Sequence, residues 1–309
     1  MKYIVTGGAG FIGSNLTKQL VADGHTVTVI DNLSTGNKKN IESLITQIKF
    51  VEGSILDLPL LQDLFQEQDV VFHEAALPSV GRSLADPKTT TEVNINGTLN
   101  VLIAARDCGI KKVVFASSSS VYGDTKVLPK VETMTPQPKS PYALTKYTDE
   151  LYCQMFSKYF GLPTACLRYF NVFGPHQSPK SEYAAVIPRF ITAALKNESP
   201  TIYGDGEQTR DFTFVKDVVK ANILAAASGV NDGSVMNIAC NKNTSLNELL
   251  NRINALLKTN VSPRYEEGRV GDVRDSLADI TKAHELIGYT PSFTLDDGLA
   301  ETIDWMKTQ

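Results

Sequence analysis

The chain has 309 residues, of which 42% are hydrophobic and 21% charged, and its net charge is −4. This length allows one large domain or two smaller ones. The balanced, slightly acidic composition gives no support to nucleic-acid binding or to a polybasic role at a membrane surface.

Membrane, metal and disulfide roles are also not expected. Nowhere do eighteen apolar residues run together, and the opening "MKYIVTGGAG" becomes a strand too early for a signal peptide. Four histidines without ligand-like spacing predict no metal site. The four cysteines are widely spaced and form no CxxC pair, which favours reduced thiols in a cytoplasmic protein: Cys108, Cys153, Cys166 and Cys240.

The first half of the chain alternates short β-branched runs with amphipathic stretches. The predicted helices include 11–23, 58–68 and 87–108, and another carries Tyr142. Strands that alternate with helices form parallel βαβ units with right-handed crossovers, so the fold class is α/β with a Rossmann-type doubly wound parallel sheet. The predicted strands are 2–6, 26–30, 48–53, 69–75, 111–117 and 163–169.

After Asn171 the pattern becomes irregular, with Pro and Gly recurring in "FGPHQSP" and "YGDGEQTRDF". We expect a smaller C-terminal α+β substrate-binding part across the open edge of the sheet, where ligands of such sheets bind. The expected domains are 1–170 for the dinucleotide, with 212–235 returning to it, and 171–309 mainly for the substrate. Elements expected in this half are 183–196, 201–203, 213–228, 245–258 and 294–307.

A glycine-rich turn follows the first predicted strand. In "VTGGAGFIG", Gly7, Gly10 and Gly13 stand three apart, directly before a predicted helix. Glycine is needed where the turn is tight, where the backbone approaches a pyrophosphate and where the helix packs on the strand. The free N–H groups of the helix N-terminus then attract phosphate. Many glycine motifs are only turns, but a strand before and a helix after favour dinucleotide binding.

Asp31 ends the second predicted strand, eighteen residues beyond Gly13. A carboxylate there accepts hydrogen bonds from the adenosine ribose and repels a 2′-phosphate, which favours NAD over NADP. The simpler alternative is that Asp31 only caps the turn "DNLSTGN".

The stretch "SPYALTKYTDELY" places Tyr142 and Lys146 on one face of a helix. A lone pair of this kind is more often a surface contact. Here, however, "FASSSSVYGD" brings serines to the carboxyl end of the fifth strand, where nicotinamide and substrate would meet. A neighbouring ammonium and a positive nicotinamide would lower the pKa of the phenol, so that it could act as a base.

The motifs "TGGAGFIG", "SSSSVYGD", "YALTK" and "LRYFNVFGP" together resemble the extended short-chain dehydrogenase/reductase family, and most closely its NAD-dependent UDP-sugar 4-epimerases. The resemblance covers essentially the whole chain. It implies a catalytic triad of Ser118, Tyr142 and Lys146. It also implies C4 epimerisation by transient oxidation to a 4-keto sugar, rotation and reduction again, and a homodimer built on helices 87–108 and 142–160.

Related reaction types remain as alternatives. Family dehydratases and decarboxylases carry an acidic residue just after the catalytic serine, where this chain has Ser119 and Ser120. Without that carboxylate, return of the hydride to the opposite ring face is the simplest outcome. A strict UDP-glucose 4-epimerase is a further alternative, and an NAD sensor would need no such triad.

The resemblance also implies the ligand contacts. Expected cofactor contacts are Gly7, Gly10, Phe11, Ile12, Gly13, Asp31, Asn32, Ser54, Ile55, Ala75, Ala76, Asn94, Tyr142, Lys146 and Tyr169. Expected substrate contacts are Ser79, Ser118, Ser119, Tyr142, Asn171, Ala185, Val186, Tyr203, Arg210, Arg269, Asp272 and Ser276. Ser54 and Pro78 depart from the family pattern, which has an adenine-contacting Asp and a pyrophosphate Lys at these positions.

Substrate size depends on Ser276, which matches the position where a family tyrosine blocks a 2-N-acetyl group. A small residue leaves room for that group without rejecting a plain hexose. We therefore expect UDP-GlcNAc/UDP-GalNAc as substrates, with UDP-Glc/UDP-Gal possible in the same site.

Overall fold

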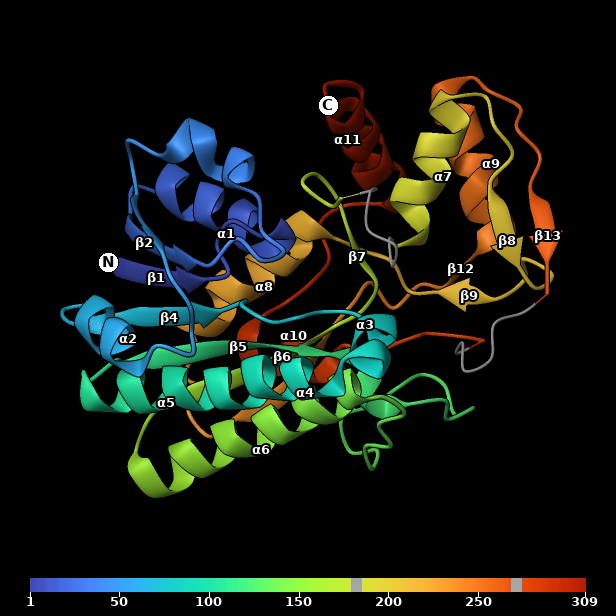
Figure 1. Cartoon of the computed structure of the whole chain (residues 1–309). Helices are drawn as coiled ribbons and strands as arrows, with labels where there is room; N and C mark the ends of the chain where they lie inside the picture. The colour runs from blue at the N-terminus through green and yellow to red at the C-terminus, as the bar shows by residue number, and fades with distance from the viewer. Residues whose placement is uncertain (179–184, 268–273) are drawn as a thin grey trace.

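The computed structural model describes residues 1–178, 185–267 and 274–309. Its centre is a seven-stranded sheet in the order β11-β6-β5-β4-β1-β2-β3, in which every neighbouring pair is parallel (Figure 1). This arrangement confirms the predicted Rossmann-type sheet. Its strands are β1 Lys2–Thr6, β2 Thr26–Asp31, β3 Lys49–Glu52, β4 Val70–His73, β5 Lys112–Ser118, β6 Thr164–Tyr169 and β11 Ser234–Ile238.

The seventh strand was not expected from the sequence. β11 pairs in parallel with β6, from Ser234 opposite Ala165 to Ile238 opposite Tyr169. Its five residues give little periodic signal, and its partner strand lies far back in the chain. Helix α8, Val215–Ala227, precedes β11 and contacts β5 and β6. The expected return of 212–235 to the first domain stays a prediction, as does the division at residue 170.

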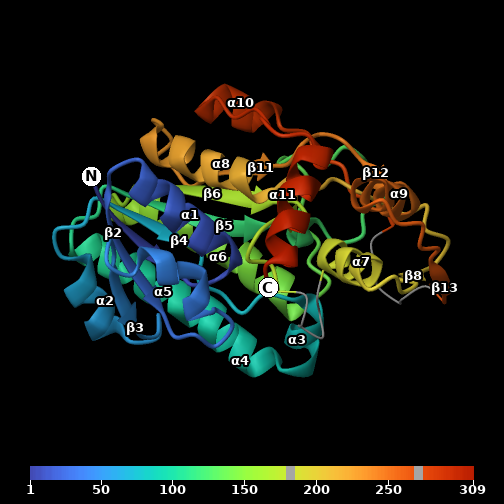
Figure 2. The same ribbon diagram turned by 90° about the horizontal axis from the view of Figure 1, so that it is seen from above.

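Helices cover both faces of the sheet (Figures 1 and 2). On one face, α1 Phe11–Ala22 and α8 share a buried cluster with α10 Thr281–Ile287. On the other, α2 Leu58–Phe65, α5 Gly97–Asp107 and α6 Pro141–Phe160 form a second cluster. Because both faces are covered, the central strands are almost continuously apolar, as expected for a parallel sheet.

The single helix predicted at 87–108 is divided in the structure. It consists of α4 Pro87–Thr91, the π-helical turn η2 Glu92–Asn96, and α5. Inside η2, the Asn94 side chain accepts a hydrogen bond from the Leu77 N–H at 2.8 Å and donates to Thr145 at 3.0 Å. The wide turn therefore ties α6 to the loop after β4. Shorter elements not expected are η1 Lys38–Leu44, α3 Val80–Ala85 and η3 Ser119–Tyr122.

The second half forms a smaller α+β part with its own core, toward which the strands of the sheet point (Figure 1). Phe173, Phe190 and Phe214 are buried in this core. None of the described helices combines the length and the apolar character needed to cross a bilayer. The elements here are α7 Val186–Leu195, α9 Leu246–Leu257 and α11 Leu295–Lys307, with the strand pairs β7 Val172–Phe173 and β10 Thr213–Phe214, β8 Thr201–Tyr203 and β13 Arg264–Glu266, and β9 Thr209–Arg210 and β12 Thr244–Ser245.

A buried ion pair fastens α6 to the sheet. Arg168 on β6 donates to both carboxylate oxygens of Glu150 on α6, at 2.8 and 2.7 Å, and the two side chains are 3% and 1% exposed. The Ser117 hydroxyl on β5 also donates to Glu150 at 2.5 Å. Two-pronged binding fixes direction as well as distance. The ion pair therefore sets how α6 lies on the carboxyl ends of β5 and β6.

We predict that Arg168→Met lowers the free energy of unfolding by about 3–5 kcal/mol, because it leaves the Glu150 carboxylate buried without its cation. The matched control is Arg252→Met, which breaks an exposed pair with Glu248 and Asp296. A solvent-screened pair contributes about 1 kcal/mol or less. Urea denaturation of both variants checks the difference, and equal losses would contradict the assignment.

Candidate active site

The glycine loop between β1 and α1 has the geometry that a dinucleotide needs. Gly7 has φ +70°, and a Cβ there would lie 2.7 Å from the Ala75 backbone. A Cβ on Gly13 would lie 2.3 Å from the Gly7 carbonyl oxygen. Gly10 caps α1 without any side chain in the way. The loop thus leaves the helix N-terminus open for phosphate, so these residues fit a bound dinucleotide.

Asp31 lies at the end of β2 with its carboxylate turned toward the glycine loop. It accepts hydrogen bonds from the N–H groups of Ala9 at 3.0 Å and Leu33 at 2.8 Å. Burial raises its pKa, while these two bonds lower it. Asp31 therefore caps the turn that follows β2, which was the simpler of the two interpretations of its sequence position. A carboxylate has about four acceptor positions, and Asp31 lines the cavity, so it retains capacity for a ribose hydroxyl.

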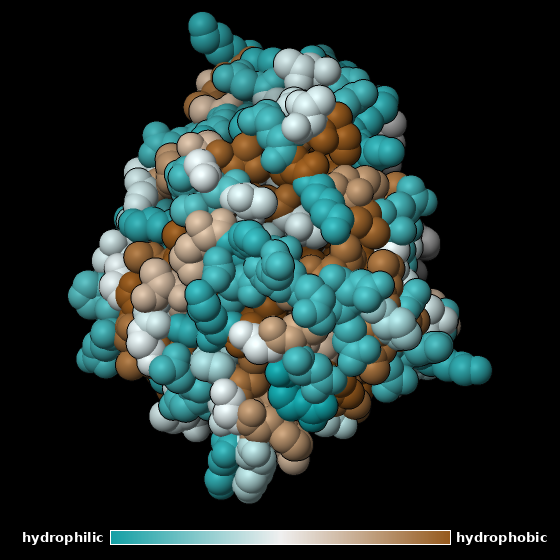
Figure 3. Space-filling view, turned by 90° about the vertical axis from the view of Figure 1, so that its left-hand side faces the viewer, coloured by the Kyte–Doolittle hydropathy of each residue, from teal (hydrophilic) through white to brown (hydrophobic). Residues whose placement is uncertain are grey.

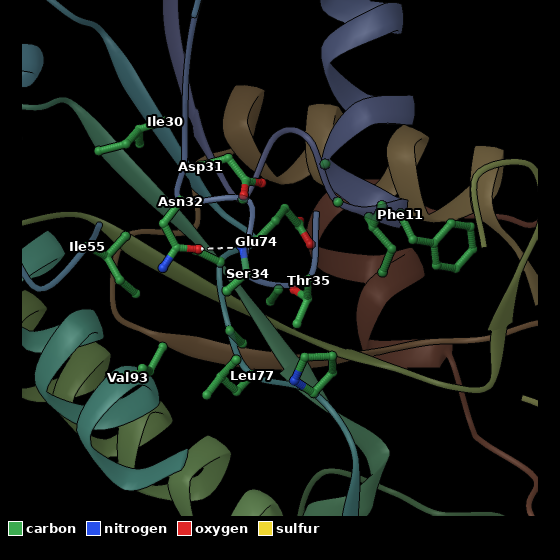
Figure 4. A pocket seen from close by; sticks show the side chains of 18 of the residues that line it. Phe11, Ile30, Asp31, Asn32, Ser34, Thr35, Ile55, Glu74, Leu77 and Val93 are labelled. Carbon is green, nitrogen blue, oxygen red and sulfur yellow. Dashed lines mark hydrogen bonds between the residues drawn. The ribbon is translucent and has the colours of Figure 1, made fainter. Parts of the chain in front are cut away.

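One cavity along the carboxyl edge of the sheet collects most of the expected cofactor contacts. Figure 4 shows Asp31, Asn32, Ile55 and Glu74 among the side chains around it. The cavity runs from the end of β2 to the helix α6, which suits a dinucleotide bound in an extended conformation. The expected residues that line it are Gly7, Gly10, Phe11, Ile12, Gly13, Asp31, Asn32, Ile55, Ala75, Ala76, Tyr142, Lys146 and Tyr169.

Two expected cofactor residues do not line this cavity. The Ser54 hydroxyl accepts from the Leu56 N–H at 3.1 Å. Asn94 is 1% exposed and is engaged with Leu77 and Thr145. Both side chains therefore have local structural partners, and their cofactor roles stay predictions.

The start of α6 brings the expected catalytic residues to the wall of the cavity. The Ser140 side chain accepts from the Ala143 N–H, and Pro141 occupies the first turn, so the helix begins just before Tyr142. Ser118, at the end of β5, has its side chain near enough to the Tyr142 phenol to lower the pKa of that group. The Lys146 ammonium donates to the Ala116 carbonyl at 2.8 Å and lies 4.7 Å from the centre of the Phe115 ring.

Burial has the largest effect on the pKa of Tyr142. It raises the pKa of the phenol, the negative charges of Asp149 and Glu74 raise it further, and the nearby Ser118 hydroxyl lowers it. The Lys146 ammonium, which donates to the Ala116 carbonyl, is not among the groups that shift the pKa of the phenol. The lowering expected from the ammonium together with a nicotinamide stays a prediction. Burial also lowers the pKa of Lys146.

Glu74 is a site residue that the sequence analysis missed. It follows β4 and lines the cavity, and its carboxylate accepts from the Tyr169 hydroxyl at 2.7 Å. Burial raises the pKa of Glu74 to about 7. Its position at the carboxyl end of a central strand was the available signal. His73 is buried between Thr6 and Thr98, at 2.7 and 2.9 Å, which agrees with a structural role.

A second cavity lies in the smaller part of the chain and gathers several expected substrate contacts. Asn171, Ala185, Val186, Tyr203 and Arg210 all line it. Its wall also contains residues that were not expected, among them Arg189 and Gln208. This wall combines aromatic and apolar surface with guanidinium and amide donors, a set that suits a base, a sugar and phosphates.

Ser276 does not line either cavity, but it contacts Asn171, which lines the second one. The Asn171 amide donates to the Ser276 hydroxyl at 3.2 Å and to the Asp211 carbonyl at 3.0 Å. Buried Asp211 accepts from the N–H groups of Cys240 and Ala278, at 2.9 and 3.1 Å, which holds this segment in place. Ser276 is therefore positioned beside Asn171, one of the expected substrate contacts.

Three other expected substrate contacts, Ser79, Ser118 and Ser119, line neither cavity. Ser79 caps α3 and accepts from the Arg82 N–H at 3.3 Å. Ser119 opens the η3 turn, where Ser118 accepts from the Ser120 N–H. Arg269 and Asp272 fall outside the described residues. Within the described ranges, no group of three or more His, Cys, Asp or Glu residues could hold a metal ion.

Comparisons with known proteins agree with this geometry. The NAD dependent epimerase/dehydratase family model matches residues 3–239. A putative UDP-glucose 4-epimerase of Methanocaldococcus jannaschii is 42% identical over 306 residues, 98% of each chain. A UDP-N-acetyl-alpha-D-glucosaminuronate decarboxylase of Bacillus cytotoxicus is 38% identical over 318 residues, 98% of this chain and 97% of the relative.

The fold comparison gives the same answer. The structure of UDP-N-acetylglucosamine 4-epimerase from Methanobrevibacter ruminantium, in complex with UDP-N-acetylmuramic acid, superposes with a TM-score of 0.96 at 42% identity. It covers 100% of this chain and 98% of that one. The predicted kinship is confirmed, and the chain belongs to the NAD-dependent epimerase/dehydratase family.

Proposed function

We propose that this protein interconverts the C4 epimers of a UDP-hexose with NAD as its cofactor. The observation that carries the proposal is that Tyr142 and Lys146 line the dinucleotide cavity, with the Ser118 side chain near enough to the phenol to lower its pKa. The relatives are named as UDP-sugar 4-epimerases and as a decarboxylase, and both activities begin with oxidation of the sugar.

Each of the proposed catalytic side chains has a separate role. The glycine loop and Asp31 would hold NAD, which would supply a hydride acceptor for C4 of the sugar and the hydride for its return to the same carbon. Tyr142 takes the proton of the 4-hydroxyl group and later gives it back. The Ser118 hydroxyl bridges the phenol and the sugar oxygen, and so holds the oxygen in line with the phenol. Return of hydrogen to the opposite ring face requires the hexose to turn while its UDP group stays anchored, for which the second cavity provides the surface.

Epimerisation is favoured over elimination or decarboxylation by the residues after Ser118. Ser119 and Ser120 offer hydroxyl groups, and neither can withdraw a proton as a carboxylate would. With no acid–base pair at these positions, the 4-keto sugar is most simply reduced again. A decarboxylase remains the second candidate because of the 38% identical relative.

The substrate class follows from the small side chain at position 276. Ser276 lies beside Asn171 and is smaller than the tyrosine that the family can carry at this position. We propose UDP-GlcNAc and UDP-GalNAc as the preferred pair, with UDP-Glc and UDP-Gal accepted because room alone does not reject a smaller sugar. A strict UDP-glucose 4-epimerase is the alternative. Arg269 and Asp272 are proposed as further UDP contacts.

We further propose a homodimer, in which α6 contributes the interface. The exposed side of α6 carries large apolar residues at helical spacing, namely Leu144, Leu151, Met155 and Tyr159, which are 52%, 41%, 49% and 65% exposed. Elsewhere, as on the face in Figure 3, hydrophobic side chains are interspersed with hydrophilic ones. A cytoplasmic location is proposed from the four free cysteines.

Replacing the proposed base tests the mechanism. Tyr142→Phe removes the hydroxyl that moves the proton, so turnover falls by about 100- to 10,000-fold while NAD stays bound. The matched control is Tyr147→Phe on the same helix, with near-normal activity. Both are assayed with UDP-GlcNAc and UDP-glucose, and NAD is measured after release by heat. Near-normal turnover by Tyr142→Phe would reject the base, and net NADH or a decarboxylated product would reject epimerisation.

Enlarging position 276 tests the substrate class. Ser276→Tyr fills the space beside Asn171, so the ratio of UDP-GlcNAc to UDP-glucose kcat/KM falls by about 10-fold or more. Ser276→Ala serves as the control, since it removes the hydroxyl but stays small. Equal losses for both sugars in the tyrosine variant would refute the role of this position.

The oligomer is tested by light scattering at micromolar protein. The wild-type chain is expected to have the mass of a dimer, and Met155→Glu that of a monomer, because a carboxylate in an apolar interface is unfavourable. A monomeric wild-type protein would contradict the proposed interface.

A further inference from the structure

Asp149 is a buried acidic residue for which the proposed mechanism has no use. It lies on α6 and its side chain is 0% exposed. Neither carboxylate oxygen makes a hydrogen bond of ordinary geometry, although the Thr98 hydroxyl on α5 is near enough to lower its pKa. A buried carboxylate without partners is strongly unfavourable, so its presence calls for a compensating charge.

The helix places Asp149 beside the catalytic lysine. Residues three apart are neighbours on a helix, and residues seven apart return to nearly the same angle. Lys146 therefore lies next to Asp149, and Tyr142 lies two turns away on the same stripe. The other nearby cation, Arg168, is already bound to both oxygens of Glu150.

We propose that Asp149 is a positioning residue of the active site, acting as the buried counter-ion of Lys146. Burial disfavours the ammonium of Lys146, and Asp149 is the charge that most opposes this effect. The reverse also holds, because Lys146 is the charge that most opposes the effect of burial on Asp149. Burial remains the largest effect, raising the pKa of Asp149 and lowering that of Lys146, and each charge reduces the effect of burial on the other. The ammonium is kept at the Ala116 carbonyl.

Other groups face this pair from the surrounding elements. From α6 itself come Tyr142, Glu150 and Cys153, from the end of β4 comes His73, and directly after β4 comes Glu74. The pKa of His73 is lowered to about 3, so it carries no charge at neutral pH. The Glu74 carboxylate accepts a hydrogen bond from the Tyr169 hydroxyl, and its charge raises the pKa of Lys146 less than the charge of Asp149 does. Asp149 is thus the main anionic neighbour of the lysine.

This arrangement has a consequence for the pH dependence of the reaction. Asp149 raises the pKa of Lys146 and also that of Tyr142. Without its charge, the phenol would ionise at lower pH and the ammonium would lose its proton at lower pH. Both limbs of the activity profile would therefore move in the acid direction, which a purely structural residue would not cause.

A double-mutant cycle for stability tests the pairing without any enzymatic reaction. The variants are Asp149→Asn, Lys146→Met and the two combined, each purified with its bound cofactor and melted at neutral pH. Removing one partner leaves the other charge buried alone, so each single variant melts below wild type. The double variant should lose less than the sum of the two losses. Losses that add would overturn the pairing.

The pH profile of kcat/KM tests the functional role, and it depends on the proposed function because it uses the UDP-sugar that is turned over. Asp149→Asn should shift the alkaline limb by roughly one pH unit toward acid. Asp149→Glu, which keeps the charge, should return the limb toward wild type. A profile for Asp149→Asn that superposes on wild type would overturn the inference.

Glu74→Gln is the comparison variant for this profile. It removes a different charge while keeping an acceptor for Tyr169, and a smaller shift than that of Asp149→Asn is expected. A larger shift would assign the counter-ion role to Glu74 and overturn the inference for Asp149. If no UDP-sugar is turned over, the proposed function fails, whereas the stability cycle still decides the pairing.

Discussion

The attachment of α6 to the carboxyl edge of the sheet is the constraint on which the active site depends. Arg168 and Glu150 join the helix to β6 with two hydrogen bonds, and Ser117 joins it to β5. Because these contacts fix the direction of the helix, the Tyr142 phenol lies near Ser118, and Lys146 reaches the Ala116 carbonyl. The proposed catalytic groups come from β5 and α6, and the buried ion pair fixes the position of α6 on the sheet.

The same packing explains the electrostatics of the site. Helix α6 covers the sheet closely enough to bury Lys146, Asp149 and Glu150, with side chains 3% exposed or less. Burial favours the neutral form of each ionisable group, and neighbouring charges act against it. Groups with shifted pKa values cluster where proton transfer is proposed, which is typical of active sites. We infer that the buried charges are retained for the reaction, since apolar residues would pack there at less cost.

Two cavities of different origin are lined by neighbouring residues at the end of β6. The first is formed by the loops after β1, β2 and β4 together with β5 and α6, and the second by the smaller α+β part. Tyr169 lines the first and Asn171, two residues later, lines the second. The proposed function requires the hexose of a UDP-sugar held in the second cavity to reach Tyr142. The hexose can rotate only if the nucleotide part of the substrate is held at a separate place.

The sequence by itself determined the features that depend on local pattern. Alternating strands and helices predicted the doubly wound sheet, the glycine spacing predicted the loop before α1, and "YALTK" predicted the helix that carries Tyr142 and Lys146. These follow from periodicity and from backbone requirements, which neighbouring residues express directly. Only the tertiary structure could decide what depends on contacts between distant segments. It added β11 to the sheet, since that short strand is defined by its pairing with β6. In the tertiary structure the Lys146 ammonium donates to the Ala116 carbonyl, and Glu74 lines the cavity. Asp149 is buried beside the lysine. The sequence could not show these features, because the burial and charge state of a side chain depend on which elements cover it.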